Sequence, residues 1–172
     1  MAVVPAAGAS TRMGPSSTKK TYARVADRPL IVHTLSRLLA AREIAHVYLV
    51  VAPEETAGCS EAVLAPHGLA ELVTVVAGGS SRQESVMRGL LACKGAARFV
   101  VVHDGARPLV TPAMVAKTLA AARLVGAATV AIPVKDTLKR GDGEHLVTAS
   151  VDREMLWRVQ TPQAFRLDLL LD

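Results

Sequence analysis

The sequence predicts an α/β fold, a mostly parallel sheet flanked by helices. Short β-branched segments alternate with helical patterns along most of the 172 residues, as in sheets built from right-handed crossovers. The chain is 51% hydrophobic but only 3% aromatic, so its core is mainly Val, Leu, Ile and Ala, which is typical of a buried parallel sheet. Its length fits one domain, and a charged fraction of 20% argues against disorder.

Five β-branched segments are predicted to form the strands of this sheet. Each is short and apolar, and Pro53 ends the second. The predicted strands are residues 2–4, 47–51, 72–76, 99–102 and 128–132.

Four helices are predicted between these strands. The first spans residues 30–41, with Asp27 as N-cap and Pro29 near its first position, and a short second helix spans residues 61–65. The third begins at a capping-box pattern, Ser81 to Glu84, and runs to about residue 93 with Val86, Leu90 and Leu91 facing inward. The fourth begins at Thr111-Pro112 and stops at Gly126.

The alternation changes after Pro133. Residues 134–139 and 146–151, joined by a turn at 140–143, form a predicted β-hairpin arm within residues 133–153 of a single domain 1–172. A lone hairpin is marginal in water, so we expect it to pack on something, such as another subunit. Residues 154–157 favour one helical turn, 159–165 an extended segment and 167–171 the start of a helix that continues beyond the given residues.

Composition and targeting signals exclude several classes of protein. No apolar segment approaches the ~20 residues of a membrane span, and no signal peptide precedes the first strand, so we expect a cytoplasmic protein without membrane contact. Cys59 and Cys93 lack metal-ligand spacing and are expected to be reduced thiols. The net charge of +5 is dispersed and aromatics are scarce, which favours a small polyanionic substrate over nucleic acid.

The loop after the first strand is the strongest local signal. Small residues from Gly8 onward, followed by Arg12 and Lys20, can surround phosphate oxygens with backbone N–H groups and positive charge. The loop matches neither the Walker pattern nor the dinucleotide fingerprint. An ordinary strand-to-helix turn is the alternative.

Polar loops follow four of the predicted strands, at the carboxyl edge where open parallel sheets bind ligands. They comprise residues 8–20, 78–82, 103–108 and 135–137. Gly78-Gly79 permits the close approach of a base whose edge Ser85 can bind. Asp104 suits a divalent metal or a ribose hydroxyl, or else an ion pair with Arg107 that shapes the loop. The sequence has neither an H-E-x-x-H motif nor a G-x-S-x-G motif.

Together these motifs closely resemble the 2-C-methyl-D-erythritol 4-phosphate cytidylyltransferase family. The resemblance covers essentially the whole chain and rests on these segments, in order: Pro5-Ala6-Ala7-Gly8 with Arg12-Met13, Lys20-x-Tyr22, Gly78-Gly79 with Arg82 and Ser85-Val86, His103-Asp104-x-Ala106-Arg107-Pro108, Pro133-Val134-x-Asp136-Thr137-x-Lys139, Val151-Asp152-Arg153 and Gln160-Thr161-Pro162-Gln163-x-Phe165. It implies a Rossmann-like nucleotidyltransferase fold and a homodimer that exchanges its arms. It also implies transfer of CMP from CTP to 2-C-methyl-D-erythritol 4-phosphate, with Mg²⁺ and release of pyrophosphate, in non-mevalonate isoprenoid biosynthesis.

The resemblance also implies roles for individual residues. Arg12 and Lys20 match the catalytic groups that stabilise the transferring phosphate. The remaining matches are the nucleotide-binding Ala6, Ala7, Gly8, Gly79, Ser85, Asp104 and Ala106, the substrate-binding Arg107, Thr137, Arg153 and Thr161, and Asp104 again as the metal ligand.

The chain departs from the family pattern at three places. Lys19 stands where the family usually has proline, Ser80 stands where aspartate is common, and a C-terminal segment with a phosphate-binding lysine lies outside the 172 residues. Two other functions stay open: cytidylyl transfer to another polyol phosphate, such as ribitol 5-phosphate, and nucleotide binding without catalysis.

Overall fold

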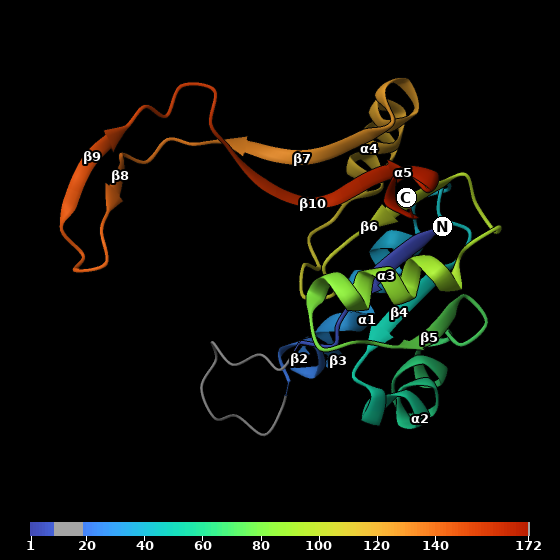
Figure 1. Ribbon diagram of the computed structural model, residues 1–172. Coiled ribbons are helices and arrows are strands. Elements are labelled where there is room, and N and C mark those ends of the chain that lie inside the picture. The colour runs from blue at the N-terminus through green and yellow to red at the C-terminus, as the bar shows by residue number, and fades with distance from the viewer. Residues whose placement is uncertain (9–18, 172) are drawn as a thin grey trace.

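A mixed six-stranded sheet forms the centre of the computed structural model, which describes residues 1–8 and 19–171 (Figure 1). Within these residues the strand order is β5-β4-β1-β6-β10-β7. The strands are β1 (Ala2–Pro5), β4 (Val47–Val51), β5 (Val73–Ala77), β6 (Phe99–Val102), β7 (Ala127–Pro133) and β10 (Trp157–Arg166). The five predicted strands are thereby confirmed to within one residue at each end.

Most of the sheet is parallel, as predicted, but on the side of β6 and β7 the strands do not follow one another in chain order. Strand β1 pairs in parallel with β4 and β6, and β4 pairs in parallel with β5. Strand β10 lies antiparallel between β6 and β7. The sequence predicted residues 159–165 to be extended, but local patterns do not reveal that a returning strand separates β6 from β7.

The helices begin and end largely where the local signals predict. They are α1 (Leu30–Leu39), α2 (Thr56–Cys59), α3 (Arg82–Ala92), α4 (Pro112–Val125) and α5 (Asp168–Leu171). The Ser81 hydroxyl accepts a hydrogen bond from the Glu84 N–H, and the Thr111 hydroxyl accepts one from the Met114 N–H. Gly126 has φ of 91°, a left-handed conformation that suits glycine at the end of α4.

The predicted cap of α1 was wrong, and the predicted helix at 61–65 was correctly placed but too short. Asp27 does not cap α1, because it sits in the turn between β2 (Arg24–Val25) and β3 (Arg28–Pro29). The predicted helix at 61–65 belongs to a longer helical stretch from Pro53 to His67, in which α2 is followed by a π-helical segment.

Two further predictions were wrong: the inward orientation of Leu91 and the helical turn at residues 154–157. Leu91 is 54% exposed on the outer side of α3, whereas Leu90 is buried. Residues 154 and 155 form a turn with Met155 at φ of 62°, and Trp157 already belongs to β10, so the segment is not a helical turn.

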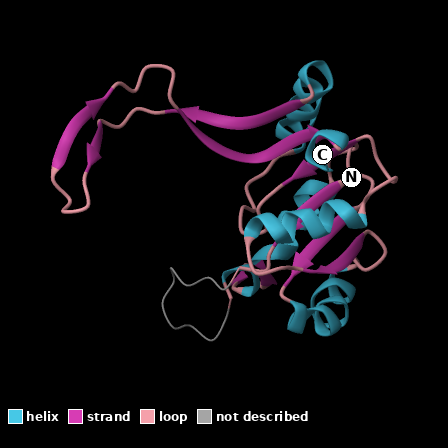
Figure 2. Ribbon diagram, viewed as in Figure 1, coloured by secondary structure: helices cyan, strands magenta, loops and turns pink. Residues whose placement is uncertain are grey.

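Helices cover both faces of the sheet, because successive strand residues point to opposite sides. On one face α1 and α4 pack with Val4 and Leu49, and on the other α3 packs with Val3 and Val50. Figure 2 shows this arrangement of helices around the strands. In the described ranges, none of the helices has the length and apolar character to cross a bilayer.

The predicted hairpin arm is present and projects from the body of the molecule (Figure 1). It consists of β8 (Leu138–Gly141) and β9 (Val147–Val151), which pair antiparallel in a separate sheet. Its base continues into β7 and β10. The arm and its base expose several large apolar side chains to solvent: Ile132, Leu146, Val147, Met155, Trp157 and Val159.

Two helical glycines provide a matched test of packing against the sheet. A Cβ at Gly89 of α3 would lie 2.4 Å from Val3 Cγ1, whereas a Cβ at Gly58 of α2 would meet nothing within 4 Å. We expect Gly89→Ala to lower the free energy of unfolding by about 1–3 kcal/mol through overpacking. Gly58→Ala should raise it by up to about 1 kcal/mol through helix propensity. Urea denaturation measures the free energy of unfolding of each variant, and equal changes in the two would contradict the packing described.

Candidate active site

Three loops leave the carboxyl edge of the sheet side by side, after β1, β5 and β6. Backbone hydrogen bonds extend beyond the strands to hold them together. The Ala6 N–H donates to the Val50 carbonyl at 2.7 Å, and the Gly78 N–H donates to the Val51 carbonyl at 2.7 Å. The Gly105 N–H donates to the Pro5 carbonyl at 3.2 Å. The predicted convergence of loops at this edge is therefore found for these three.

Gly78, the first of the glycine pair after β5, packs where a side chain would not fit. A Cβ at Gly78 would lie 2.8 Å from Ala7 Cβ and 3.0 Å from Ser85 Oγ. The Gly79 N–H donates to Ser85 Oγ at 3.1 Å, and Ser85 is buried. The structure thus brings together Ala7, Gly79 and Ser85, three of the residues predicted to bind nucleotide.

Asp104 links three segments at the end of β6. Its Oδ1 accepts from Arg82 Nη2 of α3 at 2.8 Å, and its Oδ2 accepts from Arg107 Nε at 2.9 Å. Its backbone N–H donates to Thr161 Oγ1 of β10 at 3.3 Å. Arg107 also donates to the Gln160 side chain. The Asp104–Arg107 ion pair, foreseen as an alternative to ligand binding, is present.

The surroundings of Asp104 keep it ionised. Burial alone would raise its pKa, but hydrogen bonds from Arg82 and Arg107 outweigh burial and hold the pKa below its ordinary value. The carboxylate is therefore ionised, and its negative charge is shared with the guanidinium groups of Arg82 and Arg107.

Asp104 also suits a magnesium ion that is held mainly by substrate. Across residues 1–8 and 19–171, no group of three or more His, Cys, Asp or Glu side chains forms a protein-built metal cage. Mg²⁺ is commonly held by one or two carboxylates together with substrate phosphates and water. Asp104 Oδ1 accepts from both Nε and Nη2 of Arg82, whereas Oδ2 accepts from Arg107 Nε and keeps a second lone pair for such an ion.

The other predicted site residues lie within the Asp104 loop, apart from it, or outside the described ranges. Arg12 falls in residues 9–18, which the structure does not describe. Lys20 is exposed and begins the 3₁₀ helix η2 (Lys20–Tyr22), Gly8 is exposed, and Ala6 is buried beside Val50. Ala106 lies in the turn between Gly105 and Arg107.

The structure does not bring Thr137 and Arg153 to Asp104 within one chain. Both are exposed at the base of the arm, where Arg153 donates to the Lys135 carbonyl. Figure 2 shows the arm extending away from the body.

Sequence reasoning assigned no role to Arg82 and Gln160, although both belong to the Asp104 network. Arg82 could have been found from its place directly after the Gly-Ser loop, as the first residue of α3. Gln160 stands next to Thr161, which was predicted, but a glutamine in an extended segment carries no distinctive signal.

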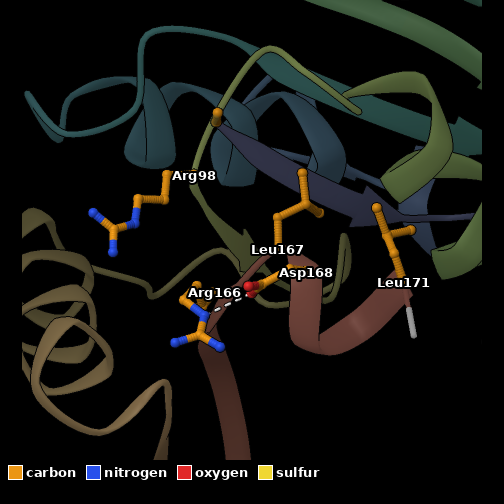
Figure 3. Close-up of a pocket in the computed structure, with 6 residues that line it drawn as sticks. Arg98, Arg166, Leu167, Asp168 and Leu171 are labelled. Carbon is orange, nitrogen blue, oxygen red and sulfur yellow. Dashed lines mark hydrogen bonds and ion pairs between the residues drawn. The ribbon is translucent and has the colours of Figure 1, made fainter.

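A cavity of about 480 Å³ lies at the opposite edge of the sheet, lined by Arg98, Arg166, Asp168 and neighbouring residues. Figure 3 shows the Arg166 guanidinium turned toward Asp168, 2.7 Å away. Because the cavity adjoins the amino end of β6, it is separate from the edge where the polar loops meet. The predicted residues line none of it.

Comparisons with known proteins agree on one family. The sequence model of 2-C-methyl-D-erythritol 4-phosphate cytidylyltransferase matches residues 1–172. A relative of that name from Desulforamulus reducens is 44% identical over 171 residues, which cover 99% of this chain and 73% of the relative.

Solved structures lead to the same family. The 2-C-methyl-D-erythritol 4-phosphate cytidylyltransferase of Thermus thermophilus is 35% identical, with a TM-score of 0.73 over 98% of this chain and 70% of that one. The 4-diphosphocytidyl-2C-methyl-D-erythritol synthase of Anaerococcus prevotii is 28% identical, with a TM-score of 0.78 over the same shares of the two chains.

The burial of His103 predicts a pH dependence of stability. His103 is 1% exposed, its Nε2 lies 3.0 Å from the Arg107 carbonyl, and its Nδ1 has no hydrogen-bond partner among the described residues. Burial lowers the pKa of His103 below its ordinary value of 6.5, so below that pH the unfolded chain takes up a proton that the folded chain excludes. The free energy of unfolding should therefore fall on acidification, with a slope approaching about 1.4 kcal/mol per pH unit.

Urea denaturation between about pH 7.5 and 5.5 measures this slope, since the histidine contribution titrates around the ordinary pKa. His103→Gln removes the ring and should have a shallower slope than the wild type. Identical slopes would show that His103 is not excluded from protonation in the folded chain.

Proposed function

The chain belongs to the 2-C-methyl-D-erythritol 4-phosphate cytidylyltransferase family, and from that membership we propose that it transfers CMP from CTP to 2-C-methyl-D-erythritol 4-phosphate. The products are 4-diphosphocytidyl-2-C-methyl-D-erythritol and pyrophosphate, and the reaction is a step in isoprenoid biosynthesis. The match of the family model to residues 1–172 carries this proposal.

In this reaction the protein aligns the two substrates and stabilises negative charge, and it supplies no nucleophile. A phosphate oxygen of the substrate attacks the α-phosphorus of CTP, the bond from that phosphorus to the bridging oxygen of the β-phosphate breaks, and pyrophosphate leaves. Negative charge grows on the α-phosphate as the reactants come into line, and fixed positive groups lower that barrier. We assign this role to Arg12 and Lys20, on the loop after β1.

The nucleotide is proposed to bind across the three converging loops. Ala6, Ala7 and Gly8 offer backbone after β1, and Gly79 and Ser85 form a small site for the cytosine edge. The tight packing of Gly78 against Ala7 and Ser85 supports this, because it holds the segment after β5 against the segment after β1.

Asp104 and Ala106 complete the proposed nucleotide site. Mg²⁺, which we propose that Asp104 holds, supplies positive charge that neutralises phosphate oxygens when it is bound. Asp104 also keeps Arg82 and Arg107 in place before any ligand arrives.

The second substrate is proposed to bind between two chains of a homodimer. Arg107 and Thr161 lie beside Asp104, whereas Thr137 and Arg153 lie on the arm of the same chain, away from it. A partner's arm would supply these two residues, and the apolar side chains exposed along the arm would be buried in such an interface. The enzyme is proposed to act in the cytoplasm.

The two alternatives have weaker support. Relatives with 42–44% identity over nearly the whole chain carry the 2-C-methyl-D-erythritol 4-phosphate name, which favours that substrate over ribitol 5-phosphate. A module that only binds nucleotide has no need of both Arg12 and Lys20.

The proposed reaction predicts a large effect at Lys20 and a small one at Lys19. With CTP and 2-C-methyl-D-erythritol 4-phosphate, Lys20→Ala should lower kcat by about 10²–10³ because a preorganised charge at the transferring phosphate is lost. Lys19→Ala should lower it several-fold at most, since Lys19 Nζ is engaged 2.7 Å from Glu55 Oε1. Pyrophosphate release measures both.

Near-normal turnover of Lys20→Ala would remove that residue from the mechanism. Pyrophosphate release with ribitol 5-phosphate, but not with 2-C-methyl-D-erythritol 4-phosphate, would overturn the assigned substrate. Release with neither would favour the module that only binds nucleotide.

A shared site predicts complementation between two impaired chains. Arg153→Ala should raise KM for the methylerythritol phosphate and leave CTP binding nearly intact, because a bidentate phosphate contact is lost. Mixing Arg153→Ala with Lys20→Ala should restore part of the activity, since one site of each heterodimer keeps both residues. If mass spectrometry shows that the two variants have exchanged subunits, and the mixture is no more active than the separate variants, Arg153 does not act across the dimer.

A further inference from the structure

One carboxylate fastens the chain on both sides of Lys20. Glu55 ends the 3₁₀ helix η3 (Pro53–Glu55), directly after β4. Its Oε1 lies 2.7 Å from Lys19 Nζ, and its Oε2 accepts from the Tyr22 hydroxyl at 3.5 Å. The same Oε2 accepts from the Ala52 N–H at 3.1 Å, which fixes the carboxylate against the end of β4.

The short helix η2 turns Lys20 away from this attachment. In a 3₁₀ helix successive side chains differ in direction by about 120°. Thr21 is buried and Tyr22 reaches Glu55, so Lys20 takes the remaining direction, and it is exposed. The Tyr22 N–H donates to the Lys19 carbonyl at 2.9 Å and closes the turn.

The contacts of Glu55 with Lys19 and Tyr22 are partly buried, and they stabilise the turn of η2. The side chains of Lys19 and Glu55 are 25% and 19% exposed, so their attraction is less screened than that of a surface pair. Tyr22 packs against the main core, and burial, with nearby Cys59 and Glu55, raises the pKa of its hydroxyl above the usual range. The hydroxyl therefore keeps its proton and stays a donor to Glu55.

We propose that Glu55 is a positioning residue, which holds Lys19 and Tyr22 so that η2 presents Lys20 to the transferring phosphate. This inference rests on the proposed function. A lysine charge on a flexible stem stabilises a transition state only if its backbone is held, and small displacements of a catalytic group lower rates steeply. Glu55 itself need not touch substrate.

A double-mutant cycle separates positioning from general destabilisation. Glu55→Ala should lower kcat by about 10-fold, with KM for both substrates nearly unchanged, because the transition-state contact of Lys20 is weakened. In the Lys20→Ala background the same change should lower kcat less than 2-fold, since Glu55 acts only through Lys20. Additive losses would overturn the proposal. The exposed neighbour Glu54 gives the control, and Glu54→Ala should match the wild type.

Two milder variants keep the test decisive if Glu55→Ala folds poorly. Glu55→Gln retains an amide oxygen for Tyr22 and Ala52 but offers no negative charge to Lys19. Tyr22→Phe removes only the hydroxyl contact. Each should lower kcat by 2- to 5-fold, and full activity in both would overturn the proposal.

Hydrogen exchange tests the attachment without any reference to catalysis. In Glu55→Ala the amides of Tyr22 and Ala23, which donate to the Lys19 carbonyl, should exchange at least 10-fold faster than in the wild type and in Glu54→Ala. Unchanged exchange would overturn the proposal even in an active enzyme. If exchange accelerates but the wild type transfers no cytidylyl group, the attachment stands as structure and the proposed function fails instead.

Discussion

Backbone hydrogen bonds along β10 join β6 on one side to β7 on the other, and the far half of the sheet depends on this pairing. Because β10 runs antiparallel, it brings the chain back from the arm to the carboxyl edge of β6. Thr161 and Gln160 reach the Asp104 network by that route. The same strand separates β7 from β6, so the arm begins at the outer edge of the sheet and extends away from the body.

The candidate site is organised by charge before any ligand binds. Asp104 is paired with two arginines, one from the start of α3 and one from its own loop, and so joins the segment after β5 to the segment after β6. Glu55 does the same at the other side, joining the chain around Lys20 to the end of β4. Asp104 thus holds two guanidinium groups in place, and Glu55 holds the ammonium group of Lys19. Such preorganised positive charge reduces the reorganisation that binding of an anionic substrate would otherwise require.

Local signals account for what the sequence predicted well. Helix α4 was placed correctly from Thr111, Pro112 and Gly126, and strand β4 from five consecutive apolar residues. The errors involve contacts that join distant residues. Asp27 was read as a cap although its neighbours pair as a small hairpin, and the place of β10 follows from pairing with residues far along the chain. No sequence pattern pointed to Glu55, because its proposed role depends on contacts with Lys19 and Tyr22, and only folding brings those residues close to it. The roles of all the predicted site residues, with Lys20 and Asp104 among them, remain predictions.

Strand β1 is the first strand of the sheet along the chain, yet it lies in the interior of the sheet, between β4 and β6. Ala2 pairs with Val47 on one side and with Val101 on the other, so neither edge of β1 can be satisfied early in translation. During synthesis the segment Ala2-Val3-Val4 therefore leaves the ribosome as an unpaired apolar strand, which is the kind of edge that associates with other chains. Closure of the sheet waits for contacts between residues remote in sequence, which slows folding. Vectorial synthesis therefore leaves β1 without its full set of strand partners until β6 has emerged.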